Sequence, residues 1–93
     1  MKKNMMQKQA ASMRNVDFSD MLFPMIVLYA SPDDFPDKII ARVWEGAKNL
    51  PTNVFCEYPD LKSGERDIMY AGFTVKIPRS PEDVASIVCS YIK

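Results

Sequence analysis

Alternation of hydrophobic and polar positions predicts four extended segments in the middle of the chain. Residues 25–30 form a continuous apolar run rich in β-branched and aromatic side chains, which is typical of a central strand. Residues 38–44, 53–58 and 67–77 alternate with a period of two, as half-buried strands do. Polar connections rich in proline, aspartate and glycine separate these segments, and we expect turns or short loops there.

The second of these strands, over residues 38–44, has two distinct faces. One face carries aliphatic side chains, namely Ile39, Ala41 and Val43. The other face carries Ile40, Arg42 and Trp44. The first set suits a hydrophobic core, whereas the second set mixes apolar and basic groups.

The C-terminal segment, residues 80–93, has the signals of an α-helix. Ser80 is a favourable N-cap residue, and Pro81 suits the first helical position. Apolar residues then recur at spacings of three and four, at Val84, Ile87, Val88 and Tyr91. The pattern predicts an amphipathic helix that packs on the sheet.

The predicted order of elements is therefore β-β-β-β-α, which indicates an α+β fold. We expect a small antiparallel sheet of three to four strands, with one C-terminal helix packed on one face. Residues 25–93 would form a single domain. Residues 1–24 would form an N-terminal extension that is mobile, or helical when it binds a partner, because Met6, Ala10 and Met13 fall near helical spacing.

Length and charge narrow the possible functions. The chain has 93 residues, which is enough for one domain, and its net charge is zero, from 12 basic and 12 acidic residues. Residues 1–15 carry four basic residues and no acidic one, whereas residues 25–93 carry eight basic and ten acidic residues. A neutral chain with a mildly acidic body is a poor electrostatic match to a phosphate backbone.

Targeting signals and cysteines favour a cytoplasmic protein that has no membrane partner. The longest apolar run, residues 21–30, is ten residues long and contains Pro24, so it is far shorter than the roughly 20 residues that span a bilayer. The residues after Lys2 and Lys3 are too polar for a signal peptide. Cys56 and Cys89 fit small buried thiols in a reducing compartment.

One stretch resembles a known group of proteins. Residues 30–44 read Ala-Ser-Pro-Asp-Asp-Phe-Pro-Asp-Lys-Ile-Ile-Ala-Arg-Val-Trp. Their proline- and aspartate-rich turn, followed by a strand with an arginine and an aromatic residue, is similar to the opening of small uncharacterised proteins of Gram-positive bacteria and their phages or mobile elements. The resemblance implies that the domain begins near Met25. It implies no activity and assigns no functional residue.

The residue types needed for most catalytic and metal sites are missing or scattered. The chain has no histidine, and its three glycines are dispersed rather than gathered in a phosphate-binding loop. Asp33, Asp34 and Asp37 form the densest acidic cluster, but they alternate with prolines in a pattern typical of a turn. We therefore expect no catalytic residue, no cofactor and no metal ligand, and we predict that the protein is not an enzyme.

A single helix covers only one face of a sheet, so the opposite face would leave apolar side chains uncovered. The candidate contact residues are Ile40, Arg42, Trp44, Phe55 and Tyr70. We predict a non-catalytic module that binds another protein chain or a second copy of itself. The alternative is a small nucleic-acid-binding accessory protein that uses a basic and aromatic strip with Arg42, Lys38 and Lys76.

Overall fold

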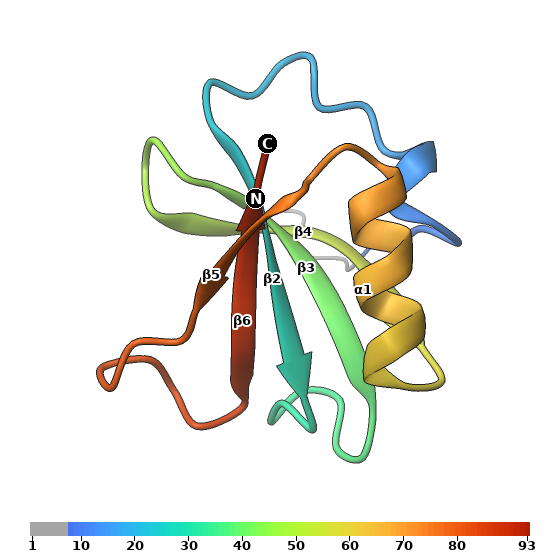
Figure 1. The fold of residues 1–93 in the computed structure, drawn as a ribbon, viewed down its shortest axis with the longest axis vertical. Coiled ribbons are helices and arrows are strands. Elements are labelled where there is room, and N and C mark those ends of the chain that lie inside the picture. Colours follow the sequence, from blue (N-terminus) through green and yellow to red (C-terminus); the bar gives the residue numbers. More distant parts are fainter. Residues whose placement is uncertain (1–7) are drawn as a thin grey trace, which may run out of the picture.

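The computed structural model describes residues 8–93, which form a mixed six-stranded sheet and one α-helix (Figure 1). The elements are β1 (Lys8–Gln9), the 3-10 helix η1 (Met13–Asn15), β2 (Pro24–Ala30), β3 (Ile39–Glu45), β4 (Leu50–Tyr58), α1 (Leu61–Tyr70), β5 (Val75–Pro78) and β6 (Ile87–Ile92). The spatial order of the strands is β1-β4-β3-β2-β6-β5. This confirms an α+β fold with one helix, although the sheet has more strands than the three to four expected.

The first half of the sheet follows the predicted pattern. Strand β2 lies between β3 and β6 and pairs antiparallel with both, in the central position expected for a continuous apolar run. On β3, the side chains of Ala41 and Val43 are buried in the core, while Arg42 and Trp44 point to the other face. The predicted faces of residues 38–44 are therefore confirmed.

Helix α1 closes the core on one face of the sheet, where it packs against β2, β3 and β4 (Figure 1). Asp60 caps its first turn, because the Asp60 carboxylate accepts a hydrogen bond from the backbone N–H of Ser63 at 2.7 Å. Ile68, a residue of this helix, is fully buried in the core. At Gly64 the helix comes so close to the sheet that a Cβ atom would lie 3.0 Å from the Tyr58 ring.

The prediction of a C-terminal helix over residues 80–93 is wrong, because that segment contains a loop and strand β6. The signals at Ser80 serve a turn instead: the backbone N–H of Asp83 donates to the Ser80 carbonyl at 3.0 Å. Residues 87–92 are rich in β-branched and aromatic side chains, and pairing with both β2 and β5 gives them ladder bonds on two sides.

The prediction of a strand over residues 67–77, preceded by a loop over 59–66, is also wrong. Those residues form α1, a turn at Gly72, and the short edge strand β5. Gly64 lies within this helix, where a Cβ atom would be 3.0 Å from the Tyr58 ring and 3.3 Å from the Leu28 side chain. The one helix thus comes before the last two strands, and not after all of them.

Residues 8–24 pack on the same core as residues 25–93. Met13 has no exposed surface, and the Phe18 ring lies 4.9 Å from the Phe73 ring, centre to centre. Strand β1 extends the sheet by pairing parallel to β4. This described part of the predicted extension therefore belongs to the same packing unit, while Met6 and the rest of residues 1–7 lie outside the described residues.

Candidate interaction surface

The side of the sheet away from α1 carries no helix among the described residues, and we call its exposed part the open face. The strand registers place on this side the residues that alternate with the core positions of β2, β3, β6 and β5. The open face is made by Met25, Tyr29, Trp44, Val75, Ile77 and Ile92, whereas Val27 and Arg42 on the same side are only 3% and 11% exposed.

The loop between β2 and β3 covers one end of this side of the sheet. The Phe35 ring packs on the Phe55 ring with centroids 4.8 Å apart. The Asp34 carboxylate lies 3.1 Å from the Arg42 guanidinium, which also donates to the Thr52 carbonyl at 3.0 Å. The Arg42 side chain is consequently only 11% exposed. This loop covers the β3–β4 end. On β2, Val27 is also buried, and the exposed apolar residues of this side include Val75 and Ile77 on β5.

Trp44 and Tyr29 form the polar centre of the open face. Both side chains are half-buried, and the Trp44 indole Nε1–H donates to the Tyr29 hydroxyl at 3.1 Å. Burial raises the pKa of Tyr29, although the hydrogen bond from Trp44 partly opposes that rise. Tyr29 therefore stays a neutral phenol at physiological pH. Since the indole N–H already has a partner, a chain that covers Trp44 would leave no unsatisfied donor there.

Phe23 and Met25 extend the open face at the start of β2. The segment before β2 is held by the Glu45 carboxylate, which accepts hydrogen bonds from the backbone N–H groups of Leu22 and Phe23, both at 2.9 Å. A Cβ atom at Gly46 would lie 2.5 Å from the Phe23 ring and 2.8 Å from the Met25 sulfur. The absence of a side chain at Gly46 thus lets both residues pack over the end of β3, where 46% of Phe23 stays exposed.

Strand β5 contributes the most exposed aliphatic residues of the open face. Val75 and Ile77 are 47% and 38% exposed, although they belong to a strand that pairs with β6. Lys76 lies between them and points to the opposite side, where its Nζ is 2.9 Å from the Glu65 carboxylate. Isoleucine and valine at alternate positions of this edge strand expose apolar area that the described residues, 8–93, leave uncovered.

The five predicted contact residues lie in different environments. Trp44 is on the open face and half-buried. Ile40 and Phe55 are only 1% and 4% exposed beneath the β2–β3 loop, and Arg42 is held by Asp34. Tyr70 is 71% exposed, but it is the last residue of α1 and so lies on the helix side. The structure therefore brings together four of the five on one side of the sheet and leaves only Trp44 partly accessible there.

The sequence prediction missed the apolar residues that the open face exposes. Val75 and Ile77 fall within the single half-buried strand predicted over residues 67–77, and that pattern does not distinguish an exposed edge strand. Their signal is the short Val-Lys-Ile-Pro run, since lysine and proline are typical of an edge strand. No comparable signal marks Phe23, whose position depends on contacts with Gly46.

The three basic residues of the alternative nucleic-acid strip are not brought together. Lys76 is on the helix side of the sheet, whereas Arg42 is on the other side. Lys38 lies 3.1 Å from the Glu57 carboxylate. Each of the three side chains is thus engaged by an acidic residue of the same chain, and no continuous basic strip forms from them.

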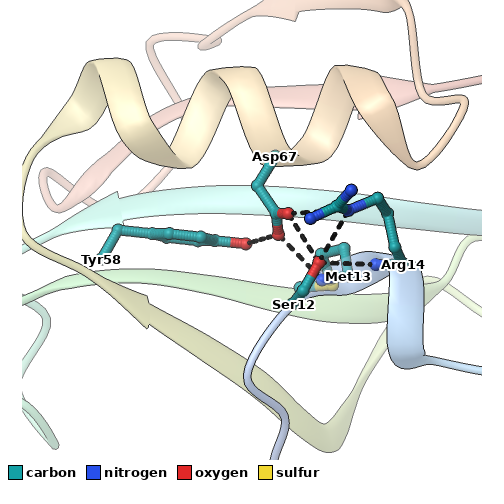
Figure 2. A network of polar contacts seen from close by, with 5 residues as sticks. All are labelled: Ser12, Met13, Arg14, Tyr58 and Asp67. Atoms are coloured by element: carbon teal, nitrogen blue, oxygen red, sulfur yellow. Dashed lines mark hydrogen bonds and ion pairs between the residues drawn. The ribbon is translucent and has the colours of Figure 1, made fainter.

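A cluster of polar contacts on the helix side fixes the N-terminal segment (Figure 2). The Asp67 carboxylate accepts hydrogen bonds from the Ser12 hydroxyl at 2.6 Å, the Met13 backbone N–H at 2.8 Å and the Tyr58 hydroxyl at 2.6 Å. The Arg14 Nε lies 3.6 Å from the same carboxylate. Burial alone would raise the pKa of Asp67, but these partners hold the pKa below its ordinary value. We call this group the Asp67 clamp.

A second tyrosine makes an equivalent contact from the other side of the helix. The Tyr91 hydroxyl, from β6, donates to the Glu65 carboxylate at 2.6 Å. Burial and the hydrogen bonds that they donate raise the pKa of both Tyr58 and Tyr91. Each carboxylate is therefore satisfied by a tyrosine within the fold, an arrangement that supports packing.

Residues 8–93 contain neither a cluster suited to a metal ion nor a helix suited to a membrane. No cluster of three or more cysteine, aspartate or glutamate side chains has the arrangement to hold a metal ion in this part of the chain. Over the same residues, no helix has the length and apolar character that crossing a membrane would require. Searches of protein-family models, curated proteins and solved structures found no match to this chain.

Proposed function

We propose that this chain is a non-catalytic protein-interaction module that binds another protein chain through the open face. The observation that carries the proposal is the exposure of Phe23, Val75 and Ile77, which leaves 46%, 47% and 38% of these side chains in water on one side of the sheet. Covering such a patch removes apolar area from water at about 25 cal/mol per Å².

The polar chemistry of the chain is consistent with a binding role. The Asp67 and Glu65 carboxylates accept hydrogen bonds from Tyr58 and Tyr91, so they support the fold. Cys56 is fully buried and burial raises its pKa, which disfavours the reactive thiolate. These groups are therefore used in packing.

We further propose that the protein works in the cytoplasm. Cys56 and Cys89 are both free thiols, on β4 and β6. Strands β3 and β2 lie between β4 and β6, so three strand spacings of about 4.8 Å separate the two cysteines by about 14 Å. That distance exceeds the reach of a disulfide. A chain with two unpaired thiols suits a reducing compartment.

Carbene footprinting tests the interaction surface. The purified chain is labelled at high dilution in buffer and, separately, in an extract of cells that produce it. We expect labelling of Val75 and Ile77 to fall several-fold in the extract, because a bound chain covers them. Met69, on α1, is 45% exposed and serves as the matched control whose labelling stays constant. Equal labelling of the open face in both samples would refute the proposal.

A further inference from the structure

We infer that residues 8–21, which we call the strap, open as a separate unit while helix α1 and strands β2 to β6 stay folded, and that the Asp67 clamp is the latch that keeps the strap closed. The strap lies on the helix side of the sheet, where η1 packs against α1 (Figure 2). Opening uncovers the buried seat of the Met13 side chain and the Asp67 carboxylate. The latch therefore controls access to this seat.

The strap joins the sheet only at its outer edge. Strand β1 pairs with β4 through Lys8 and Gln9, and the next residue, Ala10, donates its backbone N–H to the Phe55 carbonyl at 2.8 Å. The opposite edge of β4 pairs with β3, and β1 is the outermost strand on its side. Removing the strap consequently breaks no ladder between β4, β3, β2, β6 and β5.

The turns of the strap are held by contacts between residues close in sequence. The backbone N–H of Asn15 donates to the Ser12 carbonyl at 3.0 Å, and that of Met21 donates to the Phe18 carbonyl at 3.0 Å. These turns need no partner from the sheet, so the segment can leave it without losing them. Segments of this kind are the ones that open below the free energy of global unfolding.

The contacts that close the strap converge on one residue of α1. The Asp67 carboxylate accepts hydrogen bonds from the Ser12 hydroxyl and from the Met13 backbone N–H, at 2.6 and 2.8 Å, while the Met13 side chain has no exposed surface. Hydrogen bonds to an ionised group are stronger than neutral ones. When the strap leaves, the Tyr58 hydroxyl still donates to Asp67, and water replaces the lost donors. The carboxylate is therefore satisfied in both states.

A separate anchor fixes the end of the strap. The Glu45 carboxylate accepts hydrogen bonds from the backbone N–H groups of Leu22 and Phe23, both at 2.9 Å, so the chain that enters β2 is held by β3 and not by the latch. The contact between the Phe18 and Phe73 rings, with centroids 4.9 Å apart, lies on the strap side of this anchor. The anchor thus places the hinge at about residue 21.

Native-state hydrogen exchange of the full chain tests the inference. The amides of Ala10 and Met13 report on the strap, because each donates to an acceptor outside it. The amides of Leu28 and Ala41, on the paired strands β2 and β3, report on the sheet. After correction for intrinsic rates, we expect the strap amides to exchange at least about tenfold faster. Their exchange should also respond less to added urea, because strap opening exposes less surface than global unfolding.

A change in the latch should affect both sets of amides. Ser12→Ala removes the hydrogen bond from the Ser12 hydroxyl to Asp67, which is absent from the strap-open state and from the unfolded state alike. The strap and sheet amides should therefore exchange faster by the same factor, at least about tenfold. Ser19→Ala is the matched control, because Ser19 is exposed and bonds to Asp17 within the strap, and its rates should stay within about twofold.

A change in the core should affect the sheet amides alone. Val27 is 3% exposed on the side of β2 away from α1, so it stays buried when the strap opens. Val27→Ala should raise exchange at Leu28 and Ala41 about tenfold or more and leave Ala10 and Met13 unchanged. One opening free energy shared by all four amides in the natural sequence, or faster strap exchange in Val27→Ala, would overturn the inference. So would a Ser12→Ala effect confined to Met13, because the strap would then not open as a unit.

Discussion

Replacing Asp67 with asparagine should cost much of the stability of this fold, because the carboxylate is the shared acceptor of the Asp67 clamp. Three donors contact it at 2.6–2.8 Å, from Ser12, Met13 and Tyr58. A hydrogen bond to a charged group contributes about 1.5–3 kcal/mol. The three hydrogen bonds share one carboxylate that is 14% exposed, so their contributions do not simply add. Asparagine keeps one carbonyl oxygen as an acceptor. We therefore expect the free energy of unfolding to fall by about 3–5 kcal/mol.

Urea unfolding followed by the fluorescence of Trp44, the single tryptophan, measures this loss. The free energy of unfolding of a small protein falls by about 1–1.5 kcal/mol per molar urea. A loss of about 3 kcal/mol in that free energy therefore lowers the urea concentration at the unfolding midpoint by about 2–3 M. The free energy of unfolding of a small domain is about 5–15 kcal/mol in total, so the variant would be close to the limit of folding.

Asp60→Asn is the matched control for the Asp67 variant. It makes the same chemical change at the N-cap of the same helix, and asparagine caps a helix about as well as aspartate. Its midpoint should stay close to that of the natural sequence. A double-mutant cycle gives a second check, because Tyr58→Phe should destabilise the natural sequence but have little further effect once Asp67 is asparagine. If Asp67→Asn unfolds within about 1 kcal/mol of the natural sequence, the clamp is not a major source of stability.

Three further changes test other parts of the fold by the same unfolding assay. The pKa of Asp67 is lowered in the folded state. The Asp67 carboxylate therefore contributes fully to the free energy of unfolding above the unfolded pKa of about 3.9, and this contribution is lost as the pH falls through the lowered folded pKa. We expect the free energy of unfolding to drop below about pH 4, and to drop less in Asp67→Asn. Gly46→Ala should cost about 1–3 kcal/mol, because the new methyl group meets Phe23 and Met25, and a neutral result would contradict their close packing. Met13→Ala should cost about 2–5 kcal/mol since Met13 has no exposed surface, and a cost below about 1 kcal/mol would show that the segment is dispensable.

Strands β2, β3 and β4 were predictable because local and long-range preferences agree there. On β3, the alternation that puts Ala41 and Val43 on one face and Arg42 and Trp44 on the other fits only an extended chain. Turn residues also end these segments, since Ser31 and Asp37 lie at either end of the β2–β3 loop with positive φ angles. Sequence was therefore sufficient for these three strands, and not for β1 or the packing of residues 8–24.

Beyond residue 58 the sequence satisfies two periods at once, and tertiary contacts decide between them. Val84, Ile87, Val88 and Tyr91 fit a helical stripe, yet residues 87–92 are also rich in β-branched and aromatic side chains. Pairing with β2, which lies some 60 positions earlier, selects the strand. No local signal reports that pairing, so the helix and strand assignments of this half were exchanged.

The candidate surface was predictable in outline and not in detail. That one helix would leave one face of the sheet uncovered follows from the element count, and Trp44 lies on that face as expected. The burial of Ile40 and Phe55 depends on how the β2–β3 loop folds back, with Phe35 packed on Phe55, and periodicity contains no information on that contact. The exposure of Ile77 likewise requires knowing that β5 is an edge strand.

The position of the helix explains why the open face stays open. Glu65 and Asp67 are two residues apart on α1, so they project about 200° apart around its axis. Tyr91 of β6 donates a hydrogen bond to Glu65, and Tyr58 of β4 donates one to Asp67. Strands β6 and β4 lie on either side of the pair β2 and β3. The helix is thus tied on both flanks over the middle of one face and is held away from the other.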